Sequence, residues 1–195
     1  ISYEHENIIR IDVDNSKQPN SRWYSGSGIY RDVNLWTGKD VYISHDKLRI
    51  TTLSVNDDMA VIEVCAQLKN IIGHGLEAEC LIEIKKDGQK TASDTQRVVF
   101  RSEQMQTVRV QIPIEHPKKW SPKQPALYEC HITTKFDDKI CDEAVSNFGI
   151  RVLALDPVRG LQINGETVKL RGTCIHHDNG VIGAETFKEA EWYRC

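Results

Sequence analysis

The 195 residues include 39% hydrophobic and 27% charged side chains, a composition typical of folded globular proteins. The formal net charge of -3 argues against nucleic acid or an anionic membrane as a partner, and no apolar run is long enough to span a bilayer.

Apolar and polar residues alternate along most of the chain, which is the pattern of half-buried β-strands. The alternation begins in residues 8–14, stops in a loop with Pro19, Gly26 and Gly28, and resumes in residues 29–36. The later alternating segments are LRITTLSV, AVIEVCAQLKN, LEAECLIEIKKDG, TQRVVF, MQTVRVQIPI, ALYECHITTKF and ICDEAVSNFGIRVLAL. About seven short strands separated by turn signals predict an antiparallel β-sandwich. We expect hairpin turns at Asp87-Gly88 and Asn164-Gly165.

The same alternation assigns side chains to faces. Every second residue from Ile62 to Leu68 is apolar and should face the core, so Cys65 should face outward. Cys130 lies on the apolar face of its own strand, two residues after Tyr128, which has the spacing of a tyrosine corner. Because Cys65 and Cys130 lie on opposite faces, an antibody-like disulfide is not expected. We expect most of the six cysteines to be buried free thiols.

The pattern changes after residue 157 to that of a β/α unit. Lys169–Gly180 should form a buried strand that ends in His176, His177 and Asp178. The following residues AETFKEAEWYRC should begin a helix capped by Thr186. A parallel sheet needs several such units, so we expect the chain to be a piece of a larger protein.

Three motifs occur in order along the chain. They are G-I-Y-R-D-V from Gly28, W-S-P-K-Q-P-A-L-Y from Trp120, and F-G-I-R from Phe148 followed by an N-G…L-R-G…H segment that ends at His176. Together they resemble the motifs of glycoside hydrolase family 2, the β-galactosidase and β-glucuronidase family, over essentially the whole chain.

The resemblance implies three parts. Residues 1–44 would be the C-terminal part of a jelly-roll sugar-binding domain, and residues 45–153 an immunoglobulin-like β-sandwich that serves as a spacer. Residues 154–195 would begin a (β/α)8 catalytic barrel with its first strand and helix. The expected fold class is therefore mainly β, an immunoglobulin-like antiparallel β-sandwich with these two partial flanks.

The function implied by the resemblance is that of a retaining exo-β-glycosidase, β-galactosidase-like, that hydrolyses terminal β-linked sugars. Retaining enzymes use two carboxylates about 5–5.5 Å apart, and in the family both are glutamates, the first in an Asn-Glu pair. The chain has no Asn-Glu dipeptide, so no catalytic residue is assigned and the fragment alone is expected to be inactive. A non-catalytic carbohydrate- or protein-binding β-sandwich module remains the alternative.

Four residues are candidate sugar contacts. His176 matches the family histidine that hydrogen-bonds the sugar, and an imidazole can donate to or accept from a hydroxyl. Asp178 has the same strand parity. Arg22 stands where many family members have a sugar-binding aspartate, and Trp23 could stack on a pyranose ring. The alternatives are a polar loop that satisfies its own turn at residues 176–178, and ordinary packing for Trp23.

No cofactor or metal site is expected. His176, His177 and Asp178 are consecutive, so neighbouring side chains point apart, and no fourth ligand is evident. The expected partner is a carbohydrate substrate of the parent enzyme, without nucleic acid or membrane, and a homo-oligomer remains open. The N-terminal residues lack a signal-peptide pattern, which leaves the compartment open between bacterial periplasm and cytoplasm.

Overall fold

The computed structural model describes residues 2, 4–17, 28–29, 33–101, 104–174 and 187–194. Contacts divide the chain into two compact units. One comprises Ile1–Leu35 and Arg171–Cys195, and the other comprises Trp36–Leu170. No helix in the described ranges is long and apolar enough to cross a membrane.

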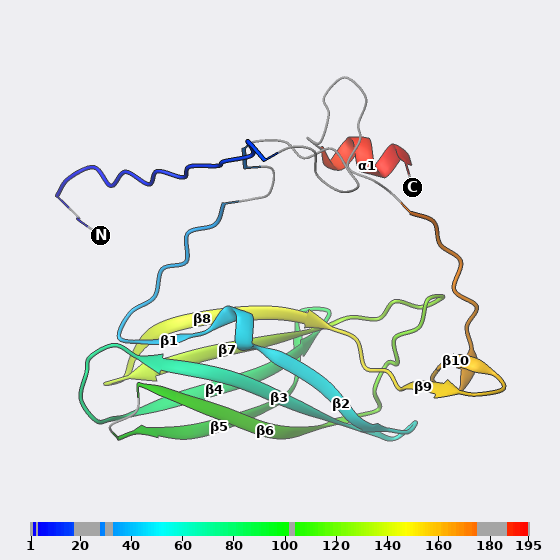
Figure 1. Cartoon of the computed structure of the whole chain (residues 1–195). Helices are drawn as coiled ribbons and strands as arrows, with labels where there is room; N and C mark the ends of the chain where they lie inside the picture. Colours follow the sequence, from blue (N-terminus) through cyan, green and yellow to red (C-terminus); the bar gives the residue numbers. More distant parts are fainter. Residues whose placement is uncertain are drawn as a thin grey trace. The chain divides into compact units, whose positions relative to one another are not determined.

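The unit Trp36–Leu170 is built around two antiparallel sheets that pack face to face (Figure 1). The first sheet contains β1 (Val41–Ile43), β2 (Arg49–Val55), β3 (Met59–Asn70) and β6 (Met105–Glu115), with the 3-10 helix η1 (His45–Lys47) between β1 and β2. The second contains β4 (Leu76–Lys86), β5 (Gln89–Phe100), β7 (Tyr128–Phe136) and β8 (Lys139–Phe148) in the order β5-β4-β7-β8. Strand β6 pairs with β3 along its length, so β1 and β2 share the other edge of β3.

Alternation along the strands builds the core. In β3 the even-numbered residues from Ile62 to Leu68 are completely buried, and the odd-numbered residues between them are half-buried. Strand β7 shows the same period, with Cys130 and Ile132 inside. Apolar faces of both sheets meet in one cluster, as sheet-on-sheet packing requires. The predicted β-sandwich is confirmed.

Both predicted hairpin turns are confirmed. Asp87 (φ 52°) and Gly88 (φ 79°) join β4 to β5, and Asn164 (φ 52°) and Gly165 (φ 83°) form the second turn. Two successive residues in the left-handed region match the twist of a two-residue hairpin, and Asn, Asp and Gly are the residues that tolerate this conformation best.

The tyrosine corner is also confirmed. Tyr128 is buried, and its hydroxyl accepts a hydrogen bond from the backbone N–H of Lys118 at 2.9 Å. Its ring stacks on Phe148 with a centroid separation of 5.7 Å. The corner therefore ties the long connection before β7 to the end of the second sheet.

The cysteines of the described residues are free thiols. Cys65 is half-buried on the outer face of β3, whereas Cys80, Cys130 and Cys141 are buried. The expected absence of a bridge between Cys65 and Cys130 is confirmed. Burial raises the pKa of Cys80 to about 12 and that of Cys130 to about 12.

We expect these thiols to differ sharply in reactivity, because only the thiolate is nucleophilic. At pH 8 a maleimide should label the exposed Cys174 first and Cys65 more slowly. Cys80 and Cys130 should react only after urea unfolding. Peptide mapping by mass spectrometry would give the order. Labelling of Cys130 as fast as Cys174 in the native chain would contradict a closed core.

A small antiparallel sheet follows the sandwich in the same unit. It contains β9 (Leu153–Asp156), β10 (Gly160–Ile163) and β11 (Glu166–Thr167), in the order β11-β10-β9. We call these three strands the exit hairpin, since the chain passes through them after leaving the sandwich. In the other unit, α1 (Lys188–Arg194) confirms the predicted helix, while its proposed cap Thr186 lies outside the described residues.

Three stretches predicted as strands are not strands. Residues 8–14 and 33–36 belong to no sheet that the structure describes, and Ile8 and Ile9 are 82% and 81% exposed. Residues 169–174 are likewise without strand structure, and Leu170 is 79% exposed. The physical reason is that a strand exists only when a neighbouring strand pairs with its backbone. Residues 175–180 of this predicted strand lie outside the described ranges.

Candidate functional site

The sugar contacts predicted from the sequence lie outside the described residues. This applies to His176 and Asp178 after the exit hairpin and to Arg22 and Trp23 near the N-terminus. Their roles therefore stay predictions. The described part of the chain shows instead how the exit hairpin, which precedes His176 in the sequence, is held within the sandwich unit.

Two of the sequence motifs meet at Trp120, on the long connection between β6 and β7. The backbone N–H of Trp120 donates to the carbonyl of Ile150 at 2.8 Å. Gly149 lies so close to Trp120 that a Cβ added there would sit 2.8 Å from both Cβ and Cγ of the tryptophan. The guanidinium carbon of Arg151 lies 4.4 Å from the centroid of the indole ring, in a cation–π contact. Gly149 and Arg151 of the F-G-I-R motif thus both pack against Trp120 of the W-S-P motif.

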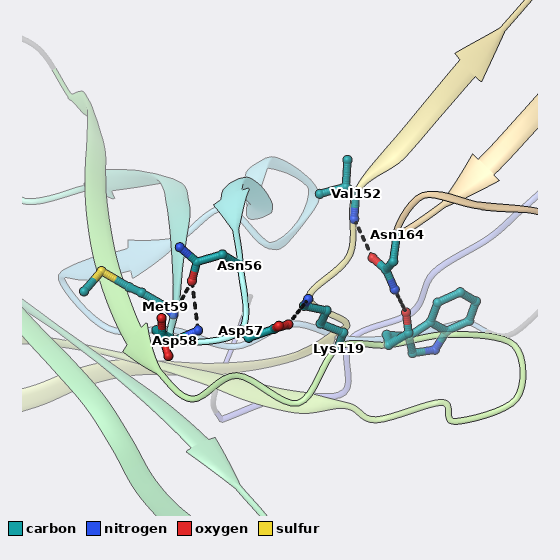
Figure 2. A network of polar contacts seen from close by, with 8 residues as sticks. Asn56, Asp57, Asp58, Met59, Lys119, Val152 and Asn164 are labelled. Carbon is teal, nitrogen blue, oxygen red and sulfur yellow. Dashed lines mark hydrogen bonds and ion pairs between the residues drawn. The ribbon is translucent and has the colours of Figure 1, made fainter.

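Asn164 joins the exit hairpin to this cluster (Figure 2). Its backbone N–H donates to the carbonyl of Val152 at 2.9 Å, and its Oδ1 accepts from the N–H of Val152 at 3.0 Å. Its Nδ2 donates to the carbonyl of Trp120 at 2.9 Å. A carboxamide can do this because it has an acceptor and a donor on one rigid group. We call Trp120, Gly149, Arg151, Val152 and Asn164 the Trp120 junction.

The turn between β2 and β3 contacts the residue before Trp120 (Figure 2). Asn56 Oδ1 accepts hydrogen bonds from the N–H groups of Asp58 and Met59 at 2.9 and 2.7 Å, which fixes the turn. Asp57 then pairs with Nζ of Lys119 at 2.7 Å, and this hydrogen bond holds the pKa of the Asp57 carboxyl below its usual range. The Asp57 side chain is 95% exposed, and exposed ion pairs add little stability, so this pair contributes little to holding the junction.

A hollow of about 490 Å³ lies where the chain enters β1. Trp36, which is 67% exposed, stacks on His45 of η1 with a centroid separation of 4.1 Å. Asp142 also lines the hollow, but Oδ2 accepts from the N–H of Ile43 at 2.8 Å and Oδ1 from the N–H of Glu143 at 2.9 Å. With both oxygens engaged by backbone, Asp142 fixes the end of β1. Among the described residues, no three His, Cys, Asp or Glu side chains gather to hold a metal ion.

Comparison with known proteins identifies the family. The sequence profile described as Glycosyl hydrolases family 2 matches residues 41–151, from β1 to the residue before Val152 of the junction. The chain belongs to glycoside hydrolase family 2. The resemblance carried by the three motifs is confirmed.

Relatives and solved structures of family 2 align along nearly the whole chain. The β-galactosidase BoGH2A of Bacteroides ovatus is 30% identical over 94% of the chain, and a putative β-glucuronidase of Formosa agariphila is 30% identical over 91%. The crystal structure of a family 2 member from Bacteroides cellulosilyticus superposes with a TM-score of 0.79 at 31% identity, over 90% of this chain and 23% of that one. The chain spans only 22% and 16% of the lengths of the first two relatives.

Two of the three family motifs have a structural role in the described part of the chain. The W-S-P and F-G-I-R motifs build the Trp120 junction rather than a sugar site in the described part of the chain. Sequence reasoning placed Asn164 in a turn and missed its side-chain role. No local signal could have shown this role, because its partner Trp120 lies 44 residues away in the sequence.

Proposed function

We propose that this chain is part of a longer exo-β-glycosidase of family 2 that hydrolyses terminal β-linked sugars with retention, and that its substrates are β-galactosides. The supporting observation is the 30% identity to the Bacteroides ovatus β-galactosidase along 94% of the chain. Residues 1–44, 45–153 and 154–195 would be the end of the sugar-binding domain, the spacer and the start of the catalytic barrel.

In this proposal the chain supplies sugar contacts and a spacer but no catalytic carboxylate. His176 and Asp178 hydrogen-bond the terminal sugar, and Arg22 and Trp23 contribute from the preceding domain. Hydrolysis requires a pair of carboxylates, and no Asn-Glu pair occurs in the sequence. The 195 residues alone are therefore inactive in this proposal.

A β-glucuronide is the second candidate substrate. The putative β-glucuronidase of Formosa agariphila is also 30% identical to the chain. Arg22 occupies the position at which the family resemblance places an aspartate, and a guanidinium can bind the carboxylate of a uronic acid with two parallel hydrogen bonds. Arg22 thus favours an acidic sugar, whereas an aspartate would favour a neutral one.

The test uses the full-length protein with aryl β-D-galactoside and aryl β-D-glucuronide. We expect hydrolysis of the galactoside, with the β-anomer of the sugar as the first product in NMR spectra, whereas hydrolysis of the glucuronide alone would replace the first candidate substrate with the second. The variant H176A should lower kcat/KM by about 100-fold, the scale of a lost and unreplaced hydrogen bond to the substrate. Residues 1–195 alone serve as the control without turnover. Hydrolysis of neither glycoside, or turnover by residues 1–195 alone, would overturn the proposal.

A further inference from the structure

We infer that Asn164 is a positioning residue of the parent enzyme. Its side-chain hydrogen bonds to Trp120 and Val152 fix the exit hairpin, and this sets the orientation in which the catalytic segment leaves the spacer. The inference rests on the proposed function. There, the sugar contacts fall on both sides of the spacer in the sequence, with Arg22 before it and His176 after it. Contacts from both sides of the spacer can meet one sugar only in a fixed arrangement of the parts, and the exit hairpin is the part of this connection that the structure describes.

The contacts of the exit hairpin show what fixes its direction at this connection. Leu155 and Leu153 of β9 are 82% and 57% exposed, so apolar burial does not fix this strand against the sandwich. Gln162 and Ile163 of β10 are buried but lie outside the main core cluster. The carboxamide of Asn164 supplies the directional contacts instead, with Oδ1 on Val152 and Nδ2 on Trp120 (Figure 2). Hydrogen bonds impose an angle as well as a distance, which apolar packing does not.

Three requirements together explain why residue 164 is an asparagine: a positive φ, an acceptor for the N–H of Val152 and a donor for the carbonyl of Trp120. Position 164 has a φ of 52°, which favours glycine, asparagine or aspartate. Glycine would keep the turn and the backbone bond but lose both side-chain bonds. Aspartate would keep an acceptor for Val152 but place a second acceptor against the carbonyl of Trp120. Asparagine meets all three requirements.

A second turn in the same unit provides the matched comparison. Asp87 has the same φ of 52° and is followed by Gly88, as Asn164 is followed by Gly165. Its side chain is exposed and pairs with its neighbour Lys86 at 2.8 Å. The turn geometry alone therefore does not require the side-chain hydrogen bonds that Asn164 makes. Replacing each residue with glycine removes a side chain at a matched backbone position.

The experiment compares N164G, N164D and D87G in the full-length protein. In N164G we expect the Val152 amide to exchange with solvent about tenfold faster, since it loses its acceptor. We also expect KM to rise about tenfold, because the contacts before and after the spacer no longer meet the same sugar. N164D should keep the protection of the Val152 amide yet raise KM, because the bond to Trp120 is lost. D87G should leave both quantities unchanged.

A KM readout separates positioning from simple loss of folded protein. Partial unfolding lowers the number of active molecules and leaves KM unaltered. In an R22A background, N164G should raise KM by less than in the unmodified protein, because the two changes disturb one shared arrangement. Unchanged KM in N164G, or fully additive effects of N164G and R22A, would overturn the positioning role while leaving the proposed function intact. If the unmodified protein hydrolysed neither glycoside, that result would instead contradict the proposed function itself.

Discussion

Replacing Ile132 with alanine should lower the free energy of unfolding by about 3 kcal/mol, within the range of a buried isoleucine truncation. Ile132 lies in the centre of β7, completely buried, and pairs with Ile82 of β4 on one side and Ala144 of β8 on the other. Neighbours on both strands are themselves backbone-paired, so the cavity would close only in part. Urea unfolding of the chain, followed by circular dichroism, measures the loss.

Thr133→Ala is the control for this prediction. Thr133 follows Ile132 in the same strand but points to the opposite face, where it is half-buried. Its truncation should cost less than about 1 kcal/mol, as substitutions on a partly exposed face usually do. Equal losses for the two variants would contradict the assignment of faces in β7.

Replacing Gly149 with alanine should lower the free energy of unfolding by about 3 kcal/mol, at the upper end of overpacking costs. The added methyl group would lie 2.8 Å from Cβ and Cγ of Trp120, near the root of that side chain rather than at a flexible tip. Trp120 cannot retreat easily, because its N–H donates to Ile150 and its carbonyl accepts from Asn164. The indole would have to leave its place beneath Arg151. Thermal and urea unfolding would both report the change.

Gly172→Ala is the matched control for the glycine. A Cβ at Gly172 would meet nothing within 4 Å, and its backbone is not in the left-handed region. The same chemical change should therefore alter stability by less than about 0.5 kcal/mol. If G149A were as well tolerated as G172A, the close approach to Trp120 could not explain the glycine of the F-G-I-R motif.

The sandwich was predictable from the sequence because the patterns that indicate its strands and turns lie within short segments of the chain. Alternation in β3 and β7 identifies which residues are buried, and Asp87-Gly88 identifies a hairpin by its turn chemistry. The same reasoning failed for residues 8–14, where the pattern is equally regular. Alternation states which face a strand would bury, but it does not show that a partner strand is present.

The Trp120 junction could not be derived from local pattern. Asn164 and Trp120 become neighbours only after the sandwich has formed, and nothing in the turn signal at Asn164-Gly165 distinguishes it from the one at Asp87-Gly88. The sugar contacts His176 and Arg22 came from the resemblance to family 2 and remain predictions. A periodicity argument alone would have assigned His176 to a polar loop.

The pairing of β3 with β6 has a consequence for how the chain folds. The hairpins β2–β3, β4–β5 and β7–β8 join neighbouring segments, whereas β3 must wait for β6 across the β4–β5 hairpin, and β4 must wait for β7 across β5 and β6. Closing these two loops is entropically costly, so the two long-range pairings should form late and slowly. Until then the unpaired edge of β3 is open to strands of other molecules. Aggregation during refolding should therefore depend on chain concentration during the time before β6 docks.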